Sequence, residues 1–227
     1  MVNSEKTKLS PLYEKRIEDM RQAKLYYNKE KLKRYGGSYD TDDHGFICFE
    51  EMDFTPEYNE DNMIYGCKLI GRNLRRFFNS FPAYIHPSSA LAGCWAGAIA
   101  RFAKIGLRPS DQPVHLKPIH EKYGITQSGI GAMNHLGPDM TIGLQLGWKG
   151  LLEKVRYYRS FNAPKDTDFY DGEEELLLGI LEYIERHVRY AYSMAEKEED
   201  PIVRQNYLEI AKVNENLLNS PPKTFRE

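Results

Sequence analysis

Apolar residues recur at helical spacing in the last quarter of the chain. Between residues 172 and 198 they define one face: Leu177, Ile180, Leu181, Ile184, Val188, Ala191 and Ala195. This spacing predicts an amphipathic helix whose apolar face is buried. Asp200-Pro201 is typical of an N-cap followed by a proline in the first helical turn, so a second helix is expected from there to Ser220. The short connection between the two predicts antiparallel packing.

The pattern is less regular toward the N-terminus. Ser10-Pro11 predicts a helix start, and apolar residues continue at helical spacing to about Arg34. A helix is also expected over 62–78. Arg72, Arg75 and Arg76 lie near its C-terminal end, where positive charge interacts favourably with the helix dipole. Residues 84–85 and 90–92 are typical of short strands, and 98–106 of a short helix. The proline-rich segment 107–118 is expected to be irregular.

Composition restricts the class of protein. The 227 residues carry a formal net charge of -2 and are 41% hydrophobic, which is typical of a globular protein without a general affinity for nucleic acid or anionic membranes. No apolar run is long enough to span a bilayer, and residues 1–10 show no signal-peptide core. Cys48, Cys67 and Cys94 lack CxxC spacing, which indicates inert thiols in a reducing, cytoplasmic setting.

Charge and aromatic content also suggest a division of the chain. Residues 40–61 are acidic and aromatic with little periodicity, as in an ordered arm that packs on a neighbouring domain or subunit. We therefore expect residues 1–61 to form an N-terminal helix and arm, and 62–227 to form the main domain.

The chemistry of greatest interest lies in residues 134–152. Pro138 disfavours helical geometry at Gly137, and Asp139 can accept the following N–H groups, so a helix is expected to begin there. His135 lies just before this start, where a ligand would meet the positive end of the helix dipole. The alternative for His135 is a hydrogen-bonded structural histidine.

Other candidates have weaker patterns. Trp95 lies between small residues that would suit a pocket wall, and Gln127 lies on the approach to His135. The three arginines of 72–76 could bind a carboxylate or phosphate ligand. His115 and His120 lie near the proline-rich segment, but neither HExxH nor a Cys/His cluster is present, so no metal site is expected.

Two blocks of sequence resemble the N-terminal portion of the glycyl radical enzymes, the pyruvate formate-lyase-like family. The first is HLGPD at 135–139, followed by LQLGWKGL at 144–151. The second extends from Phe169-Tyr170 through Asp200-Pro201 to the closing PPKTFRE at 221–227. Order and spacing are similar to the family from about Gly129 to Glu227.

The resemblance implies a fold and a chemistry. The expected fold class is mainly α with a few short strands, as the N-terminal helical part of a ten-stranded α/β barrel. Members carry a glycyl radical, installed by a separate radical S-adenosylmethionine activating enzyme, and they cleave C–C, C–N or C–O bonds of small molecules in anaerobic settings. The position of His135 then implies contact with substrate, with Gln127 and Trp95 as further substrate-binding candidates. The full-length protein is expected to be a homo-oligomer.

The chain also departs from the family. The thiyl cysteine and radical glycine loops of the family lie C-terminal to its Pro-Pro-x-Thr-Phe segment, beyond Glu227, and none of the three cysteines matches the thiyl residue. We therefore expect no directly bound cofactor, no catalytic residue in this chain and no turnover by the chain alone. Two alternatives stay open at this point. One is a stand-alone helical binding or assembly subunit that uses the arm 40–61, and the other is a small-molecule binder without chemistry.

Overall fold

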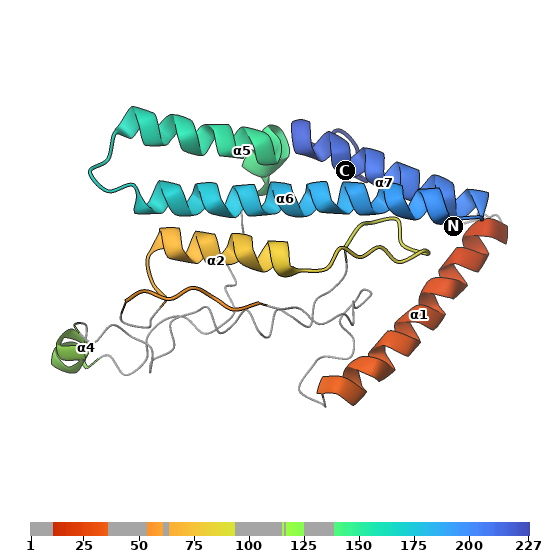
Figure 1. The fold of residues 1–227 in the computed structure, drawn as a ribbon, viewed down its shortest axis with the longest axis horizontal. Coiled ribbons are helices and arrows are strands. Elements are labelled where there is room, and N and C mark those ends of the chain that lie inside the picture. Colours follow the sequence, from red (N-terminus) through yellow and green to blue (C-terminus); the bar gives the residue numbers. More distant parts are fainter. Residues whose placement is uncertain (1–10, 36–53, 61–63, 94–114, 116, 125–138) are drawn as a thin grey trace, which may run out of the picture.

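A computed structural model describes residues 11–35, 54–60, 64–93, 115, 117–124 and 139–227. Its helices are α1 (Pro11–Tyr35), α2 (Cys67–Ser80), α4 (Lys117–Tyr123), α5 (Met140–Asn162), α6 (Asp168–Lys197) and α7 (Pro201–Asn219). α6 is the central element, with α2 on one side and α5 and α7 on the other (Figure 1). The mainly helical class predicted from the sequence is confirmed.

α6 is the long amphipathic helix that the apolar spacing predicts. Leu177, Val188, Ala191 and Ala195 on the predicted face are buried. Each large aliphatic side chain removed from water in this way contributes about 1.5–3 kcal/mol. The helix begins at Asp168 rather than near Gly172, and α5 extends to Asn162, so the loop predicted over 161–171 is reduced to residues 163–167.

The contact between α2 and α6 is a backbone contact. A Cβ added at Gly71 would lie 2.7 Å from the carbonyl carbon of Gly172, and one at Gly179 would lie 2.7 Å from the Cα of Arg75. Real Cβ atoms do not approach other atoms so closely. Only glycine at these positions lets the two helices approach to this distance.

α6 also supplies polar groups to both ends of α2. At the N-terminus of α2, Asp168 accepts the N–H groups of Cys67 (2.6 Å) and Lys68 (3.2 Å). At the other end, the Arg186 guanidinium donates to the carbonyls of Phe78 (2.6 Å) and Asn79. These groups have no partner within α2 itself, and the charges of both α6 residues suit the dipole at the end that each one meets.

The distant carboxylate of Asp168 explains an error in the sequence prediction. α2 begins at Cys67, not at Asn62, because the group that satisfies its first N–H donors lies a hundred residues away in the chain. α2 also continues to Ser80, so the three arginines lie before its last turn, and their predicted role at the helix dipole is wrong.

α7 packs antiparallel to α6, as predicted (Figure 1). Asp200 caps it by accepting the N–H groups of Ile202 (2.8 Å) and Val203 (3.3 Å), and Pro201 occupies the first turn. The core between the two helices contains Tyr207 and Ile210, which are 0% and 1% exposed.

The predicted strands are absent from the described residues. Residues 82–86 form neither helix nor strand. The N–H of Tyr84 donates to Nε2 of the buried His187 (3.3 Å), and the Tyr84 carbonyl accepts the N–H of Gly93 (2.8 Å). A side chain of α6 thus satisfies a donor that a neighbouring strand would otherwise take, and the prediction of strands at 84–85 and 90–92 is wrong.

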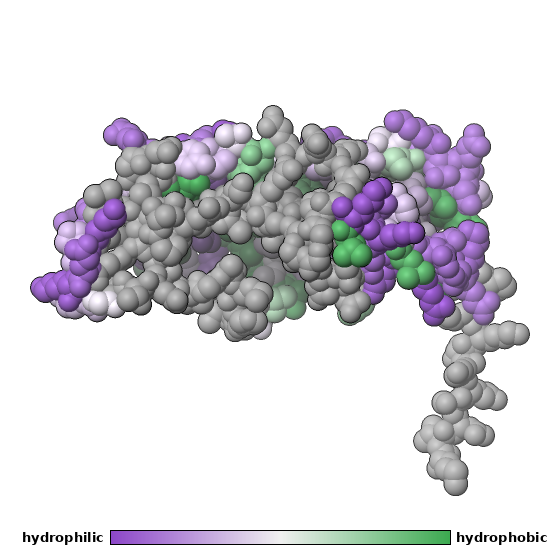
Figure 2. Space-filling view, turned by 90° about the horizontal axis from the view of Figure 1, so that it is seen from below, coloured by the Kyte–Doolittle hydropathy of each residue, from purple (hydrophilic) through white to green (hydrophobic). Residues whose placement is uncertain are grey.

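The remaining helices lie at the ends of the face seen in Figure 2. α1 and α4 carry mostly hydrophilic surface there. α1 matches the predicted N-terminal helix, and its Tyr27 hydroxyl is 2.6 Å from that of Tyr84. α4 begins at Lys117, within the segment predicted to be irregular, and accommodates Pro118 in its first turn, where proline is tolerated. The helix predicted over 98–106 lies outside the described residues. No helix in the described ranges is long and apolar enough to cross a membrane.

Gly71→Ala should lower the free energy of unfolding by about 3 kcal/mol, because the added methyl overlaps the backbone of α6. Gly143→Ala is a matched control, since Gly143 also lies within a helix but an added Cβ there would have no atom of the described residues within 4 Å. The control should be stabilised by about 0.5–1 kcal/mol through helix propensity. Urea unfolding of the two variants measures the difference, and equal stabilities would contradict the backbone contact.

Candidate functional site

The candidate site lies at the start of α5. The sequence predicts a ligand-binding histidine, His135, just before this start. Asp139 is the N-cap, as predicted, and its Oδ1 accepts the N–H of Thr141 at 2.9 Å. Because this carboxylate is exposed and already used as a cap, it has a local structural role.

α5 is broken shortly after this start. Gly147 has φ 65° and ψ 177° within the helix, and the first turns run in a different direction from the rest (Figure 1). A Cβ at Gly147 would lie 2.9 Å from the Cα of Pro221, just after the end of α7. Gly147 therefore both packs closely on the end of α7 and interrupts the helix. A Cβ added at Gly150 would lie 3.1 Å from Cβ of Leu146 in the same helix.

The three predicted substrate-binding residues, His135, Gln127 and Trp95, lie outside the described residues. What the structure describes is the frame that follows them: the capped first turns of α5, and the contact of Gly147 with Pro221 that sets their direction.

His187, on α6, is a buried histidine of the described core, with 2% of its surface exposed. Its Nδ1 lies 2.9 Å from the carbonyl oxygen of Tyr183, and its Nε2 accepts the N–H of Tyr84. Both bonds are satisfied together when Nδ1 carries the proton and the imidazole is neutral. Burial lowers the pKa of His187, and the charge of Arg186 lowers it further against the opposing hydrogen bond to Tyr183. This histidine joins α6 to the 82–93 segment and offers no free nitrogen for catalysis.

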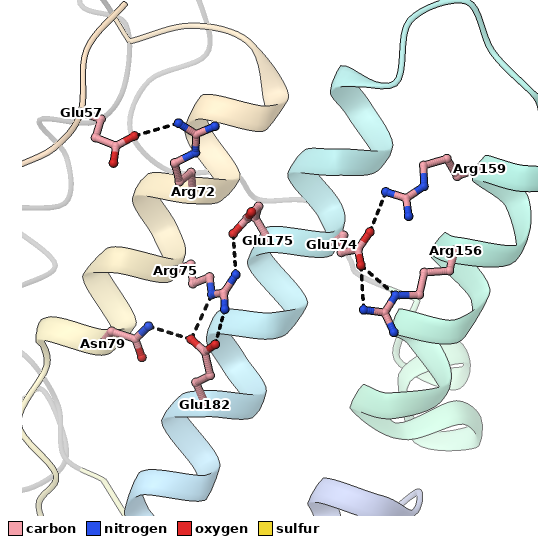
Figure 3. Close-up of polar contacts among 9 residues, drawn as sticks. All are labelled: Glu57, Arg72, Arg75, Asn79, Arg156, Arg159, Glu174, Glu175 and Glu182. Atoms are coloured by element: carbon pink, nitrogen blue, oxygen red, sulfur yellow. Dashed lines mark hydrogen bonds and ion pairs between the residues drawn. The ribbon is translucent and has the colours of Figure 1, made fainter.

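Acidic side chains of α6 pair with arginines on both sides of the helix (Figure 3). Toward α2, Arg75 pairs with Glu175 (2.9 Å) and with Glu182. Toward α5, Glu174 pairs with Arg156 (2.7 Å) and Arg159 (2.6 Å). The bond from Arg75 lowers the pKa of Glu182, and the two carboxylates raise the pKa of Arg75. These pairs position three helices relative to one another.

The other two arginines of α2 bind the arm. Arg72 and Arg76 pair with Glu57 at 3.1 Å and 2.7 Å. The buried Asn73 between them donates to the Glu57 carbonyl (3.0 Å) and accepts its N–H (2.7 Å). The three arginines thus bind carboxylates of this same chain, as ion pairs that hold the structure together.

A cavity of about 840 Å³ lies between the first turns of α1 and α7 and residues 87–88. Cations of α1 face acids of α7 across it, and its charged lining is Lys15, Arg16, Asp19, Asp200 and Glu209. Arg16 is bonded to the Ser88 carbonyl (3.0 Å) and to Asn206 (3.2 Å), and Lys15 to Asp19 (2.7 Å). Among the described residues, its lining contains none from α5.

Sequence reasoning missed the buried polar residues His187, Asn73 and Asn206. Asn206 accepts from Arg16 and Arg226 (3.4 Å) and donates to the Ser89 carbonyl (2.8 Å), which joins α1, α7 and the C-terminal segment. The one available signal was a polar residue at a position where helical spacing places the buried face. Among the described residues, no group of three or more His, Cys, Asp or Glu side chains is placed to hold a metal ion.

Comparison with known proteins supports the resemblance seen in the sequence. Residues 122–227 match the family model described as pyruvate formate lyase-like. This segment, a little under half of the chain, is similar to that family, and the resemblance drawn from the two sequence blocks is confirmed. The match begins in α4 and includes all of α5, α6 and α7 and the closing segment. No curated protein matches the sequence.

Solved structures share the fold at low sequence identity. The glycerol-bound B12-independent glycerol dehydratase from Clostridium butyricum has a TM-score of 0.56 and 14% identity over 93% of this chain. A structure on 1,2-propanediol dehydration in Roseburia inulinivorans has a TM-score of 0.54 and 15% identity over 96% of it. A glycyl radical enzyme from Archaeoglobus fulgidus has a TM-score of 0.54 and 14% identity over 93% of it. This chain spans 32% of the length of each.

Acidification should destabilise the fold through His187. Because its pKa is lowered in the folded state, the unfolded chain binds more protons as pH falls below about 6.5, and the free energy of unfolding falls by at most about 1.4 kcal/mol per pH unit. His187→Gln removes this titration, so its stability should depend less on pH between 6.5 and 5. Urea unfolding at several pH values measures both slopes. Identical slopes would show that His187 does not stay neutral in the fold.

Proposed function

We propose that this chain is the N-terminal portion of an anaerobic, cytoplasmic glycyl radical enzyme of the lyase or dehydratase type. The family match over residues 122–227 is the observation that carries the proposal. Two of the similar structures concern glycerol dehydratase and 1,2-propanediol dehydration, which supports cleavage of a bond in a small polar molecule. A glycyl radical outside this chain, installed by a radical S-adenosylmethionine activating enzyme, would supply hydrogen abstraction from the substrate by way of a cysteine thiyl.

In this proposal the chain builds a helical layer and one wall of the substrate cavity within a ten-stranded barrel. It spans about a third of the length of the similar structures, so the remaining wall and both radical loops belong to the rest of the polypeptide. Cys67, the described thiol, is exposed at the first turn of α2 and has no acidic residue after it. It therefore does not resemble the thiyl residue of the family, and the chain by itself should not turn over.

His135 has a specific role in the proposal. It lies four residues before Asp139, the cap that begins α5, and the break at Gly147 seats these turns against Pro221. An imidazole there would hydrogen-bond a substrate hydroxyl or carboxylate, or move a proton. Gln127 and Trp95 would line the same cavity. The full-length enzyme would act as a homo-oligomer.

The stand-alone assembly subunit has less support. This alternative uses the arm 40–61 to contact a partner. The described part of the arm instead contacts α2 of the same chain. Phe54 packs edge-to-face on Phe77 at 5.5 Å, and Glu57 is bonded to three residues of α2. We therefore propose the enzyme alone.

The coding sequence past Glu227 provides a direct test. An open frame that continues with a Gly-Cys-x-Glu loop and a late Arg-Val-x-Gly-Tyr or -Phe loop is expected. The mass of the protein in its native cells should agree with that frame. A stop codon directly after Glu227 would falsify the enzyme as the function of this polypeptide.

His135→Ala in the activated full-length enzyme should lower turnover by about 10²-fold, the lower end of what a positioned acid or base contributes. The glycyl radical signal in electron spin resonance should be unchanged, because the radical lies elsewhere. Asp139→Asn is the control, since asparagine caps a helix as well as aspartate does, and it should retain turnover. Unchanged turnover in His135→Ala would make His135 a structural residue.

A further inference from the structure

The last residues of the chain form an ordered turn beside α7. After α7 ends at Asn219, the chain doubles back along it (Figure 1), and Asn216 donates to Glu227 Oε1 at 3.3 Å. Arg226 pairs with Glu209 at 2.6 Å and donates to the carbonyl of Ala90 at 3.2 Å. The turn is thus bound to α7 and to the 82–93 segment.

Within the turn, Thr224 and Glu227 bond to each other in both directions. Glu227 Oε2 accepts the N–H of Thr224 at 2.8 Å, and Thr224 Oγ1 accepts the N–H of Glu227 at 3.3 Å. This reciprocal pair, three residues apart, is the capping box that begins helices, with the threonine as N-cap and the glutamate at the third helical position. Glu227 also accepts the N–H of Lys223 at 2.7 Å. These bonds lower the pKa of Glu227, the largest contribution being that of Lys223.

The sequence around the pair fits a helix start. Pro221 and Pro222 keep the preceding backbone extended, and Thr224-Phe-Arg-Glu has the S/T-x-x-E pattern. Phe225, the first residue after the cap, is fully exposed. Leu91 (61% exposed) follows Ala90, and Leu208 (38%) precedes Glu209, so apolar surface lies next to both residues that hold Arg226.

We infer that Thr224 is the N-cap of a further helix that begins at Phe225 and is continued by the residues that follow Glu227 in the full-length polypeptide. The inference rests on the proposed function, because it requires a longer chain. Arg226 fixes the direction in which this helix leaves the bundle, between Glu209 of α7 and Ala90. The helix would join the described helical layer to the rest of the enzyme and bury Phe225, Leu91 and Leu208.

The test is to extend the 227-residue chain after Glu227 by twelve residues of alanine with interspersed lysine and glutamine. A helix of this length is marginal in water, so its population should depend on its cap. Backbone ¹³Cα chemical shifts and amide exchange of the appended residues report that population. In the otherwise unchanged chain, the appended residues should be helical from Glu227 onward.

Thr224→Val keeps the shape of the side chain and removes the acceptor, and it should lower the helix–coil equilibrium constant about fivefold, as loss of an N-cap does. Glu227→Ala should act in the same direction. Lys223→Ala is the control, since Lys223 contributes its backbone N–H to the turn, and it should change nothing. An unstructured extension, or a helix that persists equally in Thr224→Val, overturns the inference. The proposed function fails separately, on a stop codon after Glu227, so the two failures are distinguishable.

Discussion

The fold depends on the backbone contact between α2 and α6 at Gly71 and Gly172. Because neither residue has a Cβ, the helices approach closely enough for Asp168 and Arg186 of α6 to reach the two ends of α2. Parallel helix dipoles repel one another, and these two charged side chains place compensating charge at the ends of α2. The ion pairs of Arg75 with α6 follow from the same close approach.

The first turns of α5 depend indirectly on the contact between α2 and α6. α7 packs on α6, and Pro221, just after α7, supports the break in α5 at Gly147. Through that contact, the end of α7 sets the direction of the first turns of α5. The closing residues 221–227 therefore take part twice, once beneath α5 and once as the cap of a further helix. The segment 221–227, which resembles the family's closing block, thus also contacts α5.

Buried polar groups fix the irregular segments, together with the packing of apolar residues such as Ile85 and Phe54. Asn73 bonds the backbone of Glu57 in the arm, His187 bonds that of Tyr84, and Asn206 bonds that of Ser89. Each side chain belongs to a helix and satisfies backbone groups of a segment without regular structure. A buried polar group without a hydrogen-bond partner costs free energy. These hydrogen bonds therefore fix the position of each segment on the helix that it contacts.

The sequence by itself determined the elements whose causes are local. The apolar face of α6, the caps Asp139 and Asp200, the prolines that begin α1 and α7, and the family motifs at 135–151 and 221–227 were all readable from spacing and residue type. The tertiary structure alone decided the start of α2 at Cys67, the absence of strands at 84–85 and 90–92 and the break at Gly147. In each case the deciding partner (Asp168, His187 or Pro221) is distant in sequence. A residue pattern records which groups need a partner, but only folding brings that partner to them.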